Sequence, residues 1–415
     1  MFWECHIVAS SVDKLLDQPV DTVKLQDFLD ESDLIQECLT QNKRLLDYLI
    51  QPNIMTELIE CIIKTPIDDN FRNACVVSEL LSGDFQRIQE KLIERENFIH
   101  LYSFVLTDEL NLNPILTSYF SRILTTLIIR KPNELLNSLK SCSTFKTDLL
   151  KHLYSTSIAD IIYRLISDSA DQRSEIIKWY EEINLIDGLI DAFIEAKSIY
   201  VQMNIVNLLT ELIRLAFDQH NTFDNDLQEN TNSNSNSSNP FSSNSNHEND
   251  DLEKNFTTLT LAQHILSKSN LEKFFDALCQ QTILVAHGCD FLNNLLDLFH
   301  RHLPAPLNIS LSHSNSDENQ GMQVNDDDEP ESTMKSNEIN ADHLANISNY
   351  AKDPFIAIYK IFLQVIPHRL PALISLLSNP SPPLIPSSPS HDNSQAIKYQ
   401  FISEPLGLPL LFSLF

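Results

Sequence analysis

Histidine, cysteine and aspartate are the residue types of this sequence that could bind a metal ion, but their spacing does not favour a site. His300 and His302 are two positions apart, as are His287 and Cys289, so on a helix the members of each pair point in different directions. We interpret them as surface or capping side chains. The run Asp326–Asp328 could hold Ca²⁺ loosely, but aspartates in such a polar stretch are more typical of a flexible acidic loop.

The common catalytic motifs are also missing from the sequence. It contains no GxGxxG or GxxxxGK[ST] loop for nucleotides, no GxSxG, no HExxH and no CxxC. Carboxylates are plentiful, but they fall mostly at helix starts and on polar faces, where capping and solvation explain them. We predict no catalytic residues, no cofactor and no bound metal. Ser381 and Ser388 each precede a proline, which makes them minimal proline-directed phosphorylation sites.

One amide lies at an unexpected place in the helical pattern. Residues 30–50, DESDLIQECLTQNKRLLDYLI, predict one helix that Ser32 would cap at its N-terminus. The apolar stripe of this helix would contain Asn42 where a hydrophobic residue is expected. Because a buried amide needs hydrogen-bond partners, Asn42 would fasten an adjacent link or contact a partner protein, unless the helical register is shifted. Asn204 and Asn207 raise the same alternatives.

The composition favours a helical protein. Of 415 residues, 42% are hydrophobic, and only 5 glycines stand beside 19 prolines. Rossmann folds, P-loops and β-rich folds need glycine where the backbone turns tightly, whereas helices need it least. The formal net charge of -28, from 57 acidic and 29 basic residues, would repel a phosphate backbone. We therefore expect an all-α fold that does not bind nucleic acid.

A succession of helices of about 10–20 residues with short links is predicted from Ser32 to about residue 219. Several have two apolar sides, which fits a stacked α-solenoid of the HEAT or armadillo type better than a bundle. One helix should end before Pro132. Other residues are expected to cap or terminate helices: Asn53, Gly83, Asp84 and the pair Asn113–Pro114.

Changes in composition divide the chain further. Residues 230–249 contain 8 Asn and 7 Ser, and residues 313–343 contain 9 acidic residues with one Lys, so neither stretch can bury a core. The helical stretches between them look like further repeats that carry long disordered insertions. We predict repeat helices at 1–219, an Asn/Ser-rich insert at 220–256, repeat helices at 257–304, an acidic insert at 305–343, repeat helices at 344–377, and a Pro/Ser-rich linker with an apolar end at 378–415.

The seven cysteines are scattered and mostly fall on apolar helical faces, which is typical of reduced thiols that act as small hydrophobic residues. The opening MFWECHIVASSVDKLL lacks a basic region and has too short an apolar run for a signal peptide. We find no stretch near the ~18 uncharged apolar residues that a membrane span needs. We expect a cytoplasmic or nuclear protein without membrane insertion.

Several blocks of the sequence resemble one known family in the same order. They are the opening MFW, VDKLLD (12–17), LQDFLDESDLIQECLTQNKRLLDYLI (25–50), LNLNPILTSYFSRILTTLIIRKPNELLNSLK (110–140), LLKHLYSTSIADIIYRLIS (149–167) and NIVNLLTELIRLAFDQ (204–219). In these blocks the chain resembles the SAPS family, regulatory subunits of protein phosphatase 6-type serine/threonine phosphatases. The resemblance extends well over residues 1–220 and weakly over 257–300.

The resemblance implies a non-catalytic helical-repeat subunit that binds the phosphatase catalytic subunit and directs it to substrates, with ankyrin-repeat subunits as further partners. The family's helical region is longer, so the apolar end LPLLFSLF looks like that of a truncated or misassembled gene product. Two alternatives stay open: a generic helical-repeat scaffold or transport adaptor, and an enzyme with a site assembled from distant carboxylates and histidines. The predicted partner contacts, each of which could instead be a cap or a surface charge, are Asp30, Glu31, Asp33, Glu37, Asn42, Asn113, Arg130 and Lys131.

Overall fold

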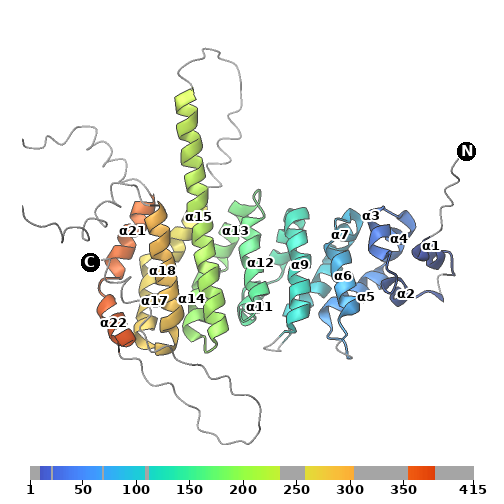
Figure 1. Ribbon diagram of the computed structural model, residues 1–415, viewed down its shortest axis with the longest axis horizontal. Coiled ribbons are helices and arrows are strands. Elements are labelled where there is room, and N and C mark those ends of the chain that lie inside the picture. The colour runs from blue at the N-terminus through green and yellow to red at the C-terminus, as the bar shows by residue number, and fades with distance from the viewer. Residues whose placement is uncertain are drawn as a thin grey trace, which may run out of the picture. The chain divides into compact units, whose positions relative to one another are not determined.

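The computed structural model describes residues 10–19, 22–67, 70–107, 112–233, 258–302 and 354–378, with only the backbone described for 220–233. Within these ranges the regular elements are all helices, with no strand, as Figure 1 shows. This confirms the all-α prediction. The chain forms two units, Met1–Ala262 and Gln263–Phe415.

The helices of the first unit follow one another with short links. They are α1 (Ser11–Leu16), α2 (Leu25–Leu29), α3 (Leu34–Leu39), α4 (Lys43–Leu49), α5 (Pro52–Ile63), α6 (Arg72–Ser82), α7 (Gln86–Leu92), α8 (Arg95–Tyr102), the 3-10 helix η2 (Ser103–Val105), α9 (Pro114–Arg130), α10 (Pro132–Ser141), α11 (Phe145–Lys151), α12 (Thr156–Ser167), α13 (Arg173–Glu182), α14 (Leu185–Glu195) and α15 (Ile199–Ser233).

Three helices recur as a repeating group: α6–α8, then α9–α11, then α12–α14. The first helices of successive groups pack side by side, α6 on α9, α9 on α12 and α12 on α15, and we call these four the long-helix layer (Figure 1). Helices of the other layer also pack in succession, α5 on α8 and α11 on α14. Because each group contacts its chain neighbours, the arrangement confirms the predicted helical-repeat solenoid for this unit.

Helix α9 shows why the sequence builds such a layer. Its buried residues lie on two sides, since a helix between two neighbours must be apolar toward both: Leu116, Phe120, Ile123, Leu124, Leu127 and Ile128. The exposed remainder is a narrow line that includes Ser118, Arg122 and Ile129. The two apolar sides noticed in the sequence are therefore the contacts with α6 and α12.

The single helix predicted over residues 30–50 is wrong. The chain forms α3 and α4 instead, separated by a break in which Gln41 has a φ of 61°. Asn42 occupies the N-cap of α4, where its side chain accepts a hydrogen bond from the Leu45 amide. Ser32 is not a cap either, because α3 begins at Leu34 with Asp33 in the N-cap position. The apolar pattern survives the break because both short helices pack on the same core.

The other predicted helix ends were correct in part. Asn113 caps α9 with Pro114 as its first residue, and α9 ends before Pro132, as predicted. Gly83 follows α6 as predicted, in an extended rather than a left-handed conformation. The predicted caps at Asn53 and Asp84 are wrong. Helix α5 already begins at Pro52, so Asn53 lies inside it. Helix α7 begins at Gln86 with Phe85 in its N-cap position, so Asp84 lies one residue too early.

Helix α15 continues to Ser233, so the backbone of residues 220–233 is helical where the Asn/Ser-rich insert was predicted to begin. Beyond Ser233, the predicted insert at 220–256 lies outside the described residues. The acidic insert at 305–343 and residues 379–415 lie outside them as well. These ranges include Asp326–Asp328, Ser381 and Ser388. The predicted division into six segments stays a prediction.

The described helices of the second unit include α17 (Lys268–Gln280), η3 (Thr282–Leu284), α18 (Val285–His302), α21 (Pro354–Val365) and α22 (Leu370–Ser378). Their core contains packed aromatic rings, with centroids 5.0 Å apart for Phe274 and Phe291 and 5.1 Å apart for Phe299 and Phe362. Arg369, next to α22, forms two hydrogen bonds with the carboxylate of Asp276 in α17, at 2.6 and 3.0 Å. These contacts join segments that are about ninety positions apart in the sequence.

Candidate functional site

Three of the predicted contact residues meet in a cluster at the start of the first unit, which we call the N-terminal polar cluster: Ser11, Asp13, Asp33, Glu37 and Asn42. The side-chain amide of Asn42 donates hydrogen bonds to Oδ1 of Asp13 at 3.0 Å and to Oε2 of Glu37 at 2.9 Å. Its oxygen accepts from the Leu45 backbone amide at 3.3 Å. Asn42 therefore ties α1, α3 and α4 together, which agrees with the interpretation that it fastens a link.

Asp33 joins the same cluster through Ser11. Its carboxylate accepts hydrogen bonds from the Ser11 backbone amide at 3.1 Å and from the Ser11 hydroxyl at 2.5 Å. The hydroxyl bond lowers the pKa of Asp33 and outweighs the opposing effect of burial. An ionised Asp33 at neutral pH thus holds the N-terminal end of α1 against the start of α3.

Asp30 and Glu31 differ in what they contact. Asp30 accepts from Arg72 at the start of α6, with 2.6 Å between the carboxylate and the guanidinium, and its backbone carbonyl accepts a second bond at 3.2 Å. Among the described residues the side chain of Glu31 has no hydrogen bond or ion pair that would tie it to the fold. Glu31 is therefore the member of the predicted set that is most open to a partner.

The three predicted residues around α9 also serve the fold. Asn113 caps α9 by accepting from the amides of Ile115 and Leu116. Arg130 pairs with Asp84 at 3.0 Å, and Lys131 pairs with Glu90 at 3.4 Å. These pairs connect the end of α9 to the preceding group, α6–α8. The N-terminal polar cluster involves α1, α3 and α4, so the two sets of predicted residues belong to different groups of helices.

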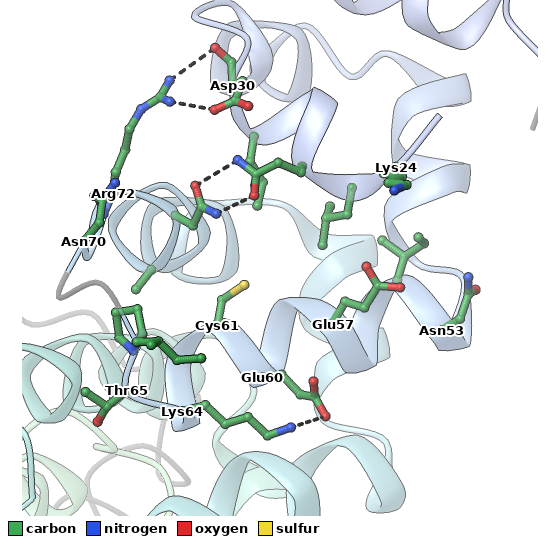
Figure 2. A pocket seen from close by; sticks show the side chains of 18 of the residues that line it. Lys24, Asp30, Asn53, Glu57, Glu60, Cys61, Lys64, Thr65, Asn70 and Arg72 are labelled. Atoms are coloured by element: carbon green, nitrogen blue, oxygen red, sulfur yellow. Dashed lines mark hydrogen bonds and ion pairs between the residues drawn. The ribbon is translucent and has the colours of Figure 1, made fainter. Parts of the chain in front are cut away.

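A groove of about 1030 Å³ lies between α2, α5 and the link into α6. Figure 2 shows charged and amide side chains around it, several of them already paired: Asp30 with Arg72, and Lys64 with Glu60 at 2.8 Å. Cys61 points into this space (Figure 2). Burial, with smaller contributions from Glu57 and Glu60, raises the pKa of its thiol. The thiol is therefore protonated at neutral pH and is a poor nucleophile.

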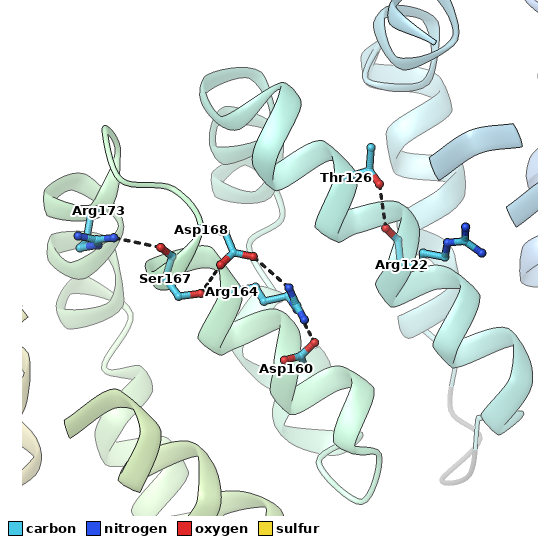
Figure 3. Close-up of polar contacts among 7 residues, drawn as sticks. All are labelled: Arg122, Thr126, Asp160, Arg164, Ser167, Asp168 and Arg173. Atoms are coloured by element: carbon cyan, nitrogen blue, oxygen red, sulfur yellow. Dashed lines mark hydrogen bonds and ion pairs between the residues drawn. The ribbon is translucent and has the colours of Figure 1, made fainter. Parts of the chain in front are cut away.

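The long-helix layer presents a polar strip on α12 (Figure 3). Arg164 lies between two carboxylates one turn away on either side, Asp160 at 2.6 Å and Asp168 at 3.1 Å. These hydrogen bonds raise the pKa of Arg164, so its charge is fixed. Ser167 donates to Asp168 at 2.6 Å. This i, i+4 arrangement could have been read from the sequence, where D-x-x-x-R-x-x-x-D is visible, but it was not predicted.

Other polar groups of the layer join one helix to the next. The Thr126 hydroxyl donates to the Ser82 carbonyl at 3.1 Å and so links α9 to α6. The half-buried Arg173 donates to the carbonyls of Ile166 and Ser167 at 2.8 and 3.0 Å, which satisfies the C-terminal end of α12. Figure 3 shows Arg122 on α9 directed away from the α12 strip.

Asn204 was predicted to fasten a link or contact a partner, and it does the former. It is buried, and its amide donates to the carbonyls of Leu153 at 2.8 Å and Tyr154 at 3.1 Å, in the turn between α11 and α12. Asn207, one turn further along α15, is exposed. The two asparagines thus have different environments despite their similar positions in the sequence.

The described ranges contain neither a candidate metal site nor a candidate membrane span. No group of three or more His, Cys, Asp or Glu side chains in those ranges is placed to hold a metal ion. None of the helices found there has the length and apolar character required to cross a membrane.

Stacked three-helix groups, each packed on its neighbours along the chain, define a helical-repeat protein. Residues 124–397 match the SAPS family, described as SIT4 phosphatase-associated protein, and the chain belongs to this family. This confirms the resemblance seen in the sequence.

Named relatives agree with the family assignment. The chain is 33% identical over 228 residues to serine/threonine-protein phosphatase 6 regulatory subunit 3 of Gallus gallus, covering 53% of this chain and 26% of the relative. It is 35% identical over 227 residues to regulatory subunit 2 of Mus musculus, covering 53% and 24%. It is 28% identical over 220 residues to extragenic suppressor of kinetochore protein 1 of Schizosaccharomyces pombe, covering 50% and 26%. The chain thus spans about a quarter of the length of these relatives. No solved structure matches it.

Proposed function

We propose that this chain is a non-catalytic regulatory subunit that binds the catalytic subunit of a protein phosphatase 6-type serine/threonine phosphatase and directs it to substrates. The observation that carries the proposal is membership of the SAPS family together with relatives named as regulatory subunits of phosphatase 6. The repeat architecture supports it, because stacked helices offer long surfaces to a folded partner.

We extend the proposal to further partners and to location. Ankyrin-repeat subunits would join the complex, and the complex would act in the cytoplasm or nucleus. The described cysteines support a reducing compartment because all of them are free thiols: Cys38, Cys61, Cys75, Cys142, Cys279 and Cys289.

Co-expression of the full chain with a phosphatase 6-type catalytic subunit tests the proposal. We expect the two proteins to co-elute in size-exclusion chromatography with light scattering, and the complex to release phosphate from a phosphopeptide. A serine/threonine phosphatase catalytic subunit of another type is the control and should elute separately. Separate elution of the phosphatase 6-type subunit from a folded chain would contradict the proposal and favour a scaffold or transport adaptor without a phosphatase.

The predicted contact residues stay a prediction, and Glu31 gives the sharpest test of them. Asp30, Asp33, Glu37 and Asn42 all hold the fold, so changing them would confuse binding with stability. Glu31→Lys breaks no described side-chain hydrogen bond or ion pair and should weaken the complex about tenfold or more if the acidic segment faces the phosphatase. Glu96→Lys, on the exposed first turn of α8, is the matched control and should bind as the original chain does. Equal binding by both variants would remove the acidic segment from the interface.

A further inference from the structure

A second groove, of about 380 Å³, lies between α12 and α15 in the long-helix layer. Its apolar lining comes from Ala159 and Leu208, which are nearly buried, and from the ring of the half-buried Tyr163. Two carboxylates lie at its edge, Asp160 with 43% and Glu211 with 44% of the side chain exposed. Apolar walls below exposed carboxylates suit a side chain with a hydrocarbon stem and a cationic end.

The two charged side chains that line this groove, Asp160 and Glu211, are both carboxylates. Asp160 shares Arg164 with Asp168, while Glu211 pairs with Arg214 at 3.1 Å. Each carboxylate keeps oxygen lone pairs that can accept further bonds. Outside the lining, Arg173 interacts electrostatically with Asp168. Burial raises the pKa of Tyr163, and the nearby Glu211, Asp168 and Asp160 raise it further while Arg214 lowers it.

Asn207 adds a group that can recognise a peptide backbone. It lines the groove, it is exposed, and its side-chain amide makes no hydrogen bond within the described part of the chain. One amide offers both a donor and an acceptor, which are the groups that an extended main chain presents. The side-chain amide of Asn204, by contrast, already donates hydrogen bonds to the carbonyls of Leu153 and Tyr154.

We propose that the groove between α12 and α15 binds an extended segment of a partner protein by taking in a lysine or arginine side chain. The stem packs against Ala159, Leu208 and the Tyr163 ring, the cation is bound by Asp160 and Glu211, and Asn207 holds the peptide main chain. An acidic or phosphorylated segment would meet the two carboxylates that line the groove and is disfavoured. This site does not depend on the phosphatase proposal, since either could hold without the other.

Degenerate octapeptide libraries test the proposal, each with a different fixed residue at the central position and mixed residues elsewhere. The full chain is applied to the immobilised libraries at physiological salt. We expect the libraries with central lysine or arginine to retain the most protein. Retention on these two that is no greater than on the glutamine library would overturn the proposal.

Matched charge reversals then locate the binding. Glu211→Lys should lower retention on the lysine and arginine libraries about tenfold, and Asn207→Ala should lower it several-fold. Glu79→Lys makes the same charge change at an exposed position of α6 in the same layer and should leave retention unchanged. Circular dichroism confirms that each variant is folded. An equal loss with Glu79→Lys would show general attraction to an acidic protein and would overturn the proposal. Co-elution with the phosphatase is measured separately, so failure of one proposal does not decide the other.

Discussion

At the scale of single residues, buried polar groups in this chain serve mainly to connect one helical group to the next. Asn42 joins three short helices, and Asn204 holds the turn between α11 and α12. Tyr180 differs, since it connects two helices of one group: its buried hydroxyl in α13 donates to the Ile162 carbonyl in α12 at 3.0 Å. In a repeat protein the links are where backbone groups lose their helical partners, so amides and hydroxyls are most useful there.

His152 should make the stability of the first unit depend on pH. It is fully buried, and Nε2 lies 3.1 Å from the Val105 carbonyl, while Nδ1 has no partner among the described groups. Burial lowers the pKa of His152, so the folded state holds a neutral ring that donates from Nε2. The unfolded chain binds the proton more readily, and the free energy of unfolding should therefore fall as pH drops below about 6.5.

Urea unfolding followed by circular dichroism between pH 7.5 and 5 measures this effect. His152→Gln should unfold more easily at pH 7.5, by about 1–3 kcal/mol for a disturbed buried hydrogen bond, but should lose less stability on acidification. His100→Gln, at a half-buried position of α8, is the control and should keep the original pH dependence. An unchanged slope in His152→Gln would contradict the assignment.

At the scale of elements, prolines and asparagines determine where the helices of the first unit begin. Pro52, Pro114 and Pro132 are each the first residue of a helix, where the missing amide hydrogen is not needed. Gly188 lies where α14 packs on α11: a Cβ there would lie 2.6 Å from Cε of Lys146 and 2.9 Å from Cδ1 of Leu150, so a larger residue would require these side chains to move. Helix starts are thus local features, while helix approach depends on neighbours.

Removing the cap of α9 should destabilise the first unit measurably. Asn113→Ala leaves the amides of Ile115 and Leu116 without their side-chain acceptor and should cost about 1 kcal/mol in the free energy of unfolding. Asn113→Asp keeps an acceptor oxygen at the helix N-terminus and should lie within a few tenths of the original value. Denaturant unfolding of both variants checks this, and equal losses would show that the side chain does not cap the helix.

At the scale of the whole molecule, the first unit is held together by contacts between neighbouring groups. In the long-helix layer, α6 packs on α9, α9 on α12, and α12 on α15. Such an arrangement can open from an end without disturbing distant groups, whereas a defect in the middle affects both sides.

Two leucine-to-alanine changes should distinguish these cases in hydrogen exchange. Leu45 in α4 and Leu127 in α9 are both fully buried, and truncating either should cost about 2–5 kcal/mol locally. Leu45→Ala should speed exchange in α1–α5 and leave α12 protected, whereas Leu127→Ala should speed it in both α6 and α12. Loss of protection throughout the unit in Leu45→Ala would show a single cooperative structure instead.

The sequence alone determined the fold class of this protein. Few glycines, helices with two apolar sides and short links specify stacked helices, because apolar periodicity reports directly on burial. The cap at Asn113 could be predicted because capping depends on residues next to each other in the sequence. The family could be identified because several blocks of the sequence resemble it in the same order. The break at Gln41 was not visible, since α3 and α4 share one apolar pattern whether or not the backbone turns between them.

Only the tertiary structure decided which polar residues are free to act. Asp33 and Arg130 look like surface charges in the sequence, but their partners Ser11 and Asp84 lie far from them along the chain. Asn204 and Asn207 are three positions apart and indistinguishable by type, yet one is buried against a turn and the other is exposed in the groove. Side-chain chemistry is fixed by the sequence, whereas exposure and pairing are fixed by which helices pack together.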